Sequence, residues 1–193
     1  MRKRAIGHER GFTITELMLA VAIGVIVVGM ALGGVTGLIK NTRADGGLAT
    51  AAAGLRAARE LSVSTRRNVQ ITFGTNTIMN TRVEYCTPVA TCTPTTTLVR
   101  TTTLEGRVQF QLETGVPDTP DGFGMATATA FGALTPPMFT TDGSFINSNG
   151  DVVNGTLFMG VVNEPLTARA ITIFGPTGAM RLWKWNGRAW VEA

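Results

Sequence analysis

The feature that most constrains this chain is a run of 23 residues without a charged side chain, Leu17 to Ile39. An α-helix rises about 1.5 Å per residue, so a helix of this length can cross a hydrocarbon core of roughly 30 Å. The run therefore predicts a transmembrane helix near the N-terminus.

A basic leader precedes the apolar run and contains four cations: Arg2, Lys3, Arg4 and Arg10. By the positive-inside rule, this end stays in the cytoplasm and the chain after Lys40 is exported. An ordinary secretory signal, cut at small residues around Ala31 to Gly33, is an alternative interpretation. The sequence thus places most of the protein outside the cytoplasm.

One acid, Glu16, lies at the start of the apolar run, and a secretory signal has no use for it. An ionised carboxylate in an apolar helix costs at least about 2.5 kcal/mol, so such a residue is expected to be functional. A cut between Gly11 and Phe12 would create an α-amino group one helical turn from Glu16, in the same chain or a neighbour. A plain single-pass anchor with a stray glutamate is the alternative.

The leader, Gly11, Phe12-Thr13-Ile14, Glu16-Leu17-Met18 and the apolar run resemble the class III signal of type IV pilins and of the pseudopilins of type II secretion. The resemblance implies cleavage after Gly11 by a membrane prepilin peptidase and N-methylation of Phe12. It also implies that Glu16 acts in assembly with other pilin or pseudopilin subunits.

The chain departs from many major pilins, which carry a proline where this chain has Gly33. Gly33-Gly34 also weakens a helix, because glycine costs about 1 kcal/mol relative to alanine. Gly29, Gly33 and Gly37 follow a spacing of four residues, which allows helices to approach closely. Packing in a helical bundle and a loose hinge are both possible, and we favour packing.

Helical periodicity continues after Lys40, with one apolar face formed by Leu48, Ala51, Ala52, Leu55, Ala58, Leu61 and Ser62. The pattern predicts one helix from near Phe12 to about Arg67, with a bend or break possible at Gly46-Gly47 or Gly54. The passage from Leu55 to Phe73 resembles the helix-to-first-strand passage of the GspH/FimT group of minor pseudopilins and minor pilins.

Strand-like alternation begins at Val69. Predicted strands cover Val69 to Phe73, Ile78 to Tyr85, Thr97 to Thr103, Arg107 to Leu112, Thr156 to Val162, Ala170 to Phe174 and Met180 to Trp185. Asn186-Gly187 predicts a terminal hairpin in which both turn residues tolerate positive φ, and Thr114 to Pro137 is expected to be a long loop.

The predicted fold is therefore α+β, a long N-terminal helix packed on antiparallel sheet. The expected divisions are a leader (1–11), a transmembrane and assembly helix (12–39), its amphipathic continuation (40–68) and a β-rich globular domain (69–193).

Cys86 and Cys92 are the only cysteines, with five residues between them in a Thr/Pro segment. In an exported protein, a close and even pair predicts a disulfide that closes a small exposed loop. No redox chemistry is expected.

The residue types argue against an enzyme. His8 is the only histidine and lies in the leader, so Ser-His-Asp catalysis and histidine-bound metals are excluded for a processed chain. Oxygen ligands for calcium could come from loop residues, but EF-hand spacing is absent and turns explain them better: Asp118, Asp121, Asn147, Asn149 and Asp151. We expect no catalytic residue, metal or cofactor.

Net charge gives little support to an anionic partner. The formal charge is +4, but four of the 17 basic and one of the 13 acidic residues precede Phe12, which leaves 13 against 12, or +1. DNA binding by a minor pilin of an uptake machine remains the alternative function, because phosphate contacts and aromatic stacking hold single strands. Its candidate residues are Arg56, Arg59, Arg66, Arg67, Arg82, Arg181, Lys184, Arg188, Trp183, Trp185 and Trp190.

The expected function is a minor pilin or pseudopilin, held in the bacterial inner membrane by one helix with its globular domain in the periplasm, and then assembled into a filament. The sequence does not distinguish a type IV pilus subunit from a type II secretion pseudopilin.

Overall fold

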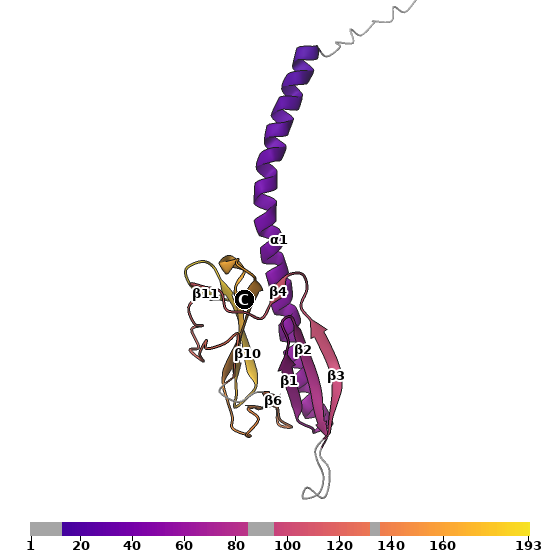
Figure 1. Ribbon diagram of the computed structural model, residues 1–193, viewed down its shortest axis with the longest axis vertical. Helices are drawn as coiled ribbons and strands as arrows, with labels where there is room; N and C mark the ends of the chain where they lie inside the picture. Colours follow the sequence, from indigo (N-terminus) through magenta and orange to yellow (C-terminus); the bar gives the residue numbers. More distant parts are fainter. Residues whose placement is uncertain (1–12, 85–94, 132–135) are drawn as a thin grey trace, which may run out of the picture. The chain divides into compact units, whose positions relative to one another are not determined.

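A computed structural model of the chain describes residues 13–84, 95–131 and 136–193 (Figure 1). Side chains at 30–36, 38 and 130 also lie outside the description. The chain forms two compact units, Met1–Ile39 and Lys40–Ala193. The first is helical where it is described, and the second combines helix with antiparallel sheets.

Helix α1 spans Ile14–Thr65, 52 residues, and continues through all the glycine pairs of the sequence without a break. It ends one turn after Leu61, where Arg66 has a positive φ of 52° and the Arg67 N–H donates to the Ser62 carbonyl at 3.2 Å. This hydrogen bond closes the last turn in the manner of a Schellman cap, although glycine is the usual residue in that conformation.

The prediction of a transmembrane helix over Leu17–Ile39 is not confirmed. Within the described residues, no helix combines the length and the apolar character that crossing a membrane requires. Within this stretch, the structure describes the side chains of 17–29, 37 and 39 only. The described apolar run is therefore shorter than the run in the sequence.

The first sheet has five strands in the order β3-β2-β1-β6-β7, all antiparallel. Its strands are β1 (Val69–Phe73), β2 (Thr77–Glu84), β3 (Thr95–Thr103), β6 (Met138–Phe139) and β7 (Phe145–Ile146). The three long strands follow the predicted ranges closely, and apolar residues alternate along β1.

The second sheet has the order β11-β10-β9-β8-β4, and β5 also pairs with β8. Its strands are β4 (Val108–Gln109), β5 (Thr129–Ala130), β8 (Gly155–Val161), β9 (Arg169–Phe174), β10 (Ala179–Trp185) and β11 (Trp190–Glu192). A short 3₁₀ helix, Pro165–Thr167, precedes β9. The fold is therefore α+β with two antiparallel sheets, as the sequence predicted.

The main core lies between the second half of α1 and both sheets. The predicted apolar face is the buried face: Leu48, Ala51, Ala52, Leu55, Ala58 and Ser62 are buried and Leu61 is partly buried. They pack with apolar side chains of the strands, including Ile71, Ile78, Leu157 and Ile171.

Two glycines let the helix approach the strands. A Cβ at Gly47 would lie 2.8 Å from Val108 Cγ1, and one at Gly54 would lie 3.3 Å from Thr102 Oγ1. The Gly54 carbonyl also accepts a hydrogen bond of 3.0 Å from Asn80 Nδ2, a buried side chain on β2. Gly47 and Gly54, where a bend or break was predicted to be possible, are thus positions at which the unbroken helix approaches the strands closely.

Two sequence predictions need correction. The strand expected over Arg107 to Leu112 is only β4, two residues long, and the predicted loop Thr114 to Pro137 contains β5. Segments this short carry too few residues to show alternation, and they are strands because β8 pairs with them.

The terminal hairpin is present, but its turn differs from the expected Asn-Gly turn. Trp185 pairs with Trp190, so four residues form the loop, and the Asn186 N–H donates to the Ala189 carbonyl at 3.2 Å. Only Gly187 has a positive φ, of 96°. Asn186 Oδ1 instead accepts hydrogen bonds from the backbone of Arg188 and Ala189, as in an Asx-turn.

Candidate assembly site at the start of the N-terminal helix

Helix α1 begins with a cap made by Thr13 and Glu16. The Thr13 carbonyl accepts from the N–H groups of Glu16 at 3.1 Å and Leu17 at 3.0 Å. Thr13 Oγ1 also accepts from the Glu16 N–H at 3.3 Å and lies 3.4 Å from Glu16 Oε2, to which it can donate. The pair resembles a capping box, in which threonine and glutamate three residues apart satisfy free groups of the first turn.

The position of Glu16 favours a negative charge. It lies in the first turn of α1, where the partial positive charge of the helix N-terminus stabilises carboxylates by about 0.3–1 kcal/mol. The carboxylate is exposed and forms no ion pair within the described residues. It is thus accessible to a cation from outside the described chain.

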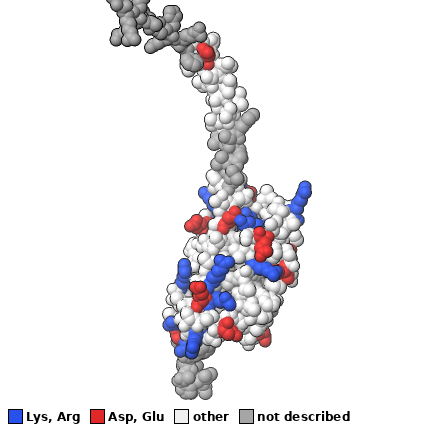
Figure 2. Space-filling view, turned by 180° about the vertical axis from the view of Figure 1, so that it is seen from behind, with Lys and Arg blue, Asp and Glu red and all other residues white. Residues whose placement is uncertain are grey.

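The surroundings of Glu16 are apolar on every side of the helix. Large apolar side chains from Ile14 to Val28 are between 54% and 79% exposed: Ile14, Leu17, Met18, Leu19, Val21, Ile23, Val25, Ile26, Val27 and Val28. The described part of this segment is white in Figure 2 apart from one acidic side chain, while blue and red side chains gather on the globular unit. A helix that is apolar all round is normally buried by other helices or by lipid.

Of the predicted site residues, the structure describes only Glu16. Gly11 and Phe12, the predicted cleavage and methylation residues, lie outside the described residues, as do Cys86 and Cys92 of the predicted disulfide. The proximity of the Phe12 amino group to Glu16 therefore stays a prediction.

Comparison with known families bears on this N-terminus. Residues 6–32 match the prokaryotic N-terminal methylation motif. The methylation motif covers Gly11, Phe12, Glu16 and the first part of the apolar run, and it supports a type IV pilin-like or pseudopilin N-terminus. It implies processing by prepilin peptidase and assembly with other pilins. Searches of curated proteins and of solved structures gave no match.

The tryptophans of the terminal hairpin are not a stacking surface. Trp183, Trp185 and Trp190 are 8–9% exposed and form a second core cluster with apolar neighbours such as Phe158. Trp190 Nε1 donates to the Pro117 carbonyl at 2.9 Å. The alternation of this hairpin places one face on a core and one in water, which is the simpler of the two interpretations that the sequence allowed.

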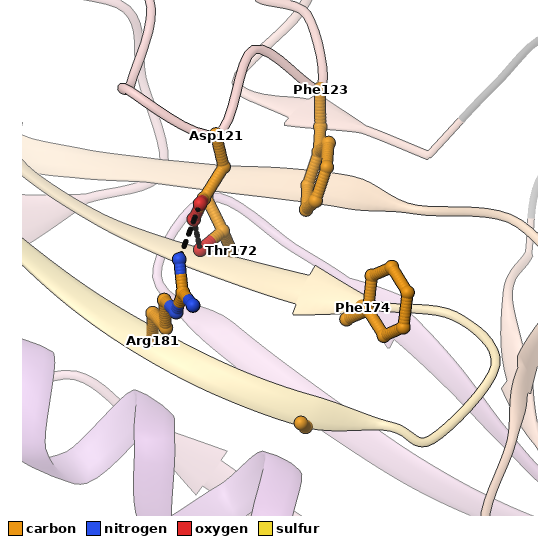
Figure 3. A pocket seen from close by; sticks show the side chains of 6 residues that line it. Asp121, Phe123, Thr172, Phe174 and Arg181 are labelled. Carbon is orange, nitrogen blue, oxygen red and sulfur yellow. Dashed lines mark hydrogen bonds and ion pairs between the residues drawn. The ribbon is translucent and has the colours of Figure 1, made fainter.

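Asp121 connects this hairpin to the loop before β5. Its carboxylate accepts from Thr172 Oγ1 at 2.5 Å, from Arg181 NH1 at 2.9 Å and from Trp183 Nε1 at 3.2 Å. Figure 3 shows Arg181 and Thr172 pointing at Asp121, with the rings of Phe123 and Phe174 beside them around a pocket of about 350 Å³. Asp121 is thus a structural partner of β9 and β10.

Several of the candidate basic residues are neutralised by ion pairs. Arg181 pairs with Asp121, Lys184 lies 3.3 Å from Asp45, and both Arg82 and Arg67 pair with Glu84. A surface that holds a nucleic-acid strand needs exposed cations together with aromatic rings on which bases stack. On the hairpin the tryptophan rings are buried, and Arg181 and Lys184 are paired with acids, so this geometry does not favour DNA binding at the hairpin.

The oxygen-bearing loop residues serve turns. Asp118 accepts from the backbone of Thr119 at 2.7 Å and of Gly124 at 3.0 Å, and Asn147 Oδ1 accepts from the backbone of Asn149 and Asp151. Within the described ranges, no three Asp, Glu, His or Cys side chains are grouped so that they could hold a metal ion.

Proposed function

We propose that this chain is a minor pilin or pseudopilin of the GspH/FimT type, a structural subunit rather than an enzyme. The observation that carries the proposal is a capped helix whose described apolar residues from Ile14 to Val28 are exposed on all sides and whose only charge before Lys40 is Glu16. In the same segment, residues 6–32 match the methylation motif.

The proposed mechanism has two parts. Apolar helix packing with neighbouring subunits covers the exposed side chains, and the gain is about 1.5–3 kcal/mol for each large apolar side chain that becomes fully buried. Glu16 then needs a cation in this apolar environment, and the α-amino group of a chain cut before Phe12 supplies it. Before assembly, the bacterial inner membrane covers the same apolar residues and the globular unit lies in the periplasm.

The subtype rests on the passage from helix to sheet. In the structure, α1 leads through the left-handed turn at Arg66 directly into β1, the central strand of the five-stranded sheet. The sequence of this passage is the one that resembles the GspH/FimT group. Both a type IV pilus and a type II secretion pseudopilus fit such a subunit.

The first experiment is the intact mass and N-terminal sequence of the membrane-extracted protein, expressed with a prepilin peptidase. We expect a chain that begins at N-methylated Phe12. An uncut Met1 or a start near Gly34 would refute the proposed processing.

The second experiment tests the role of Glu16. Glu16→Gln keeps the shape of the side chain but removes its charge, so we expect normal cleavage and a loss of about tenfold or more in filament incorporation. Glu60→Gln is the matched control, since Glu60 is an exposed acid in the second half of the same helix. Equal incorporation of both variants would reject the proposed charge pair.

A further inference from the structure

A second cluster of charges, unrelated to Glu16, surrounds a cavity of about 670 Å³ in the globular unit. The cavity opens between the start of the helical part of this unit, the turn before β4 and the turn after β8. Its polar lining residues are Lys40, Arg43, Arg107, Gln109, Asn163 and Glu164.

The sheet brings the two turns together. Val108 on β4 pairs with Val161 on β8, so the residues just before β4 lie beside those just after β8. Gly106 has a positive φ of 69°, and a Cβ there would lie 3.3 Å from Arg43 Cδ. The Arg43 side chain therefore lies beside the turn that precedes Arg107.

The charges that line the cavity do not cancel. Lys40 Nζ lies 2.5 Å from Glu164 Oε1, which is the one acid in the lining, and this pair is neutral. Arg43 and Arg107 form no ion pair with any described residue. Both arginines are exposed and line the same cavity, so an anion bound there would be attracted by both guanidinium groups.

We propose that this cavity binds the phosphate group of an anionic lipid. Arg43 and Arg107 would hold the phosphate oxygens, because the planar guanidinium group matches phosphate in two hydrogen bonds, and Gln109 offers an amide donor. The ligand carries a net negative charge, which would neutralise the positive charge of the two arginines that form no ion pair.

The position of the cavity along the chain selects a lipid as the source of the phosphate. Lys40 directly follows the apolar run, and Arg43 lies three residues further on, about 5 Å along a helix. Lysine and arginine at this distance from an apolar segment lie at the level of lipid headgroups. This placement rests on the proposed membrane anchoring, whereas the charge of the cavity does not.

The test measures lipid binding to the purified full-length chain in detergent by native mass spectrometry. Phosphatidylglycerol, which is anionic, is compared with phosphatidylcholine, which has no net charge. We expect preferential retention of phosphatidylglycerol, and a loss of about tenfold or more in that preference in the double variant Arg43→Gln/Arg107→Gln.

The matched control is Arg56→Gln/Arg100→Gln, which removes two exposed arginines that are elsewhere on the globular unit and form no ion pair among the described residues. It should keep the preference for phosphatidylglycerol, and Arg43→Lys/Arg107→Lys should keep part of it. Circular dichroism confirms that each variant is folded. An equal loss in the cavity and control variants, or no loss in either, would overturn the proposal.

A further arm separates the lipid from free phosphate. Inorganic phosphate should compete with phosphatidylglycerol for the wild-type chain but leave the residual binding of Arg43→Gln/Arg107→Gln unchanged. Thermal stabilisation by inorganic phosphate without any preference for phosphatidylglycerol would overturn the lipid as ligand. Because this assay needs no filament, a chain that begins at Phe12 but shows no preference would reject the lipid site alone and leave the proposed function intact.

Discussion

The two halves of helix α1 share one backbone conformation but have opposite surfaces. From Ile14 to Gly29, every described side chain is exposed and nearly all are apolar. From Lys40 to Thr65, a single stripe is buried in the core while charged side chains such as Arg56 and Glu60 remain in water. In one half of the helix, apolar side chains thus pack against other described residues, and in the other half they do not.

The difference shows what each half contributes. Burial of a large apolar side chain is worth about 1.5–3 kcal/mol, so the exposed half forgoes on the order of 10 kcal/mol or more of stabilisation when the subunit is alone. That free energy becomes available when other apolar surfaces cover the segment. The second half has already used its apolar stripe to fold the globular unit.

The largest effect should come from truncating one leucine in each half. Leu55 is fully buried in the main core, so Leu55→Ala should lower the free energy of unfolding by about 3 kcal/mol. Leu19 is 63% exposed, so Leu19→Ala should change it by less than about 0.5 kcal/mol. Urea unfolding of the full-length chain in detergent, followed by tryptophan fluorescence, measures both.

In an assembly assay of folded subunits, Leu19→Ala should have a clear effect, although its effect on unfolding is the smaller of the two. Leu19→Ala removes a side chain that neighbours would cover, so it should reduce filament incorporation while leaving the subunit folded. If Leu19→Ala unfolds the globular unit as readily as Leu55→Ala, the contrast between the two halves is wrong.

Local patterns explain which parts of this fold the sequence could predict. The buried stripe from Leu48 to Ser62 repeats with the helical period, and β1 alternates along its whole length, so both could be read from neighbouring residues. The N-terminal signal is equally local, since Gly11, Phe12 and Glu16 fall within six residues and lie inside the matched methylation motif.

Contacts between distant residues explain what the sequence could not predict. Strands β5 to β7 are two residues long and depend on their partners, and Asp121 finds Thr172 and Arg181 more than fifty residues away. The cavity lined by Arg43 and Arg107 combines a residue of α1 with two turns that the pairing of β4 with β8 holds side by side. Neither the spacing of residues nor the composition of the sequence predicts such contacts between distant residues.

A smaller effect should come from filling one glycine in each half. A Cβ at Gly47 would lie 2.8 Å from the buried Val108 side chain, so Gly47→Val should lower the free energy of unfolding by about 2 kcal/mol. A Cβ at Gly29 meets nothing within 4 Å in the described chain, so Gly29→Val should leave the isolated subunit unchanged. Thermal unfolding of both variants checks this prediction.

Filament incorporation of the Gly29 variant then decides between packing and a hinge. Close packing of a neighbouring helix at Gly29 predicts reduced incorporation, because the added side chain would hold the helices apart. Incorporation at the wild-type level would show that no neighbour approaches Gly29.

The smallest effect concerns the ion pair that fastens the second half of α1 to β9. Arg169 is 5% exposed and its Nε donates to Asp45 Oδ1 at 2.8 Å, while Lys184 lies 3.3 Å from the same oxygen. Burial disfavours the charged carboxylate, but the hydrogen bonds and charges of Arg169 and Lys184 outweigh it and lower the pKa of Asp45.

Because the pKa of Asp45 is lower in the folded than in the unfolded chain, the pair stabilises the fold above about pH 4, the ordinary range of Asp, and this contribution is lost as pH falls through the folded pKa. Asp45→Asn should therefore cost about 1 kcal/mol at pH 7, since water screens the half-exposed carboxylate, and almost nothing near pH 2. Urea unfolding at both pH values, with the exposed Glu192→Gln as control, measures the difference, and a cost that does not shrink in acid would show that the charge of Asp45 is not what fastens the helix to the sheet.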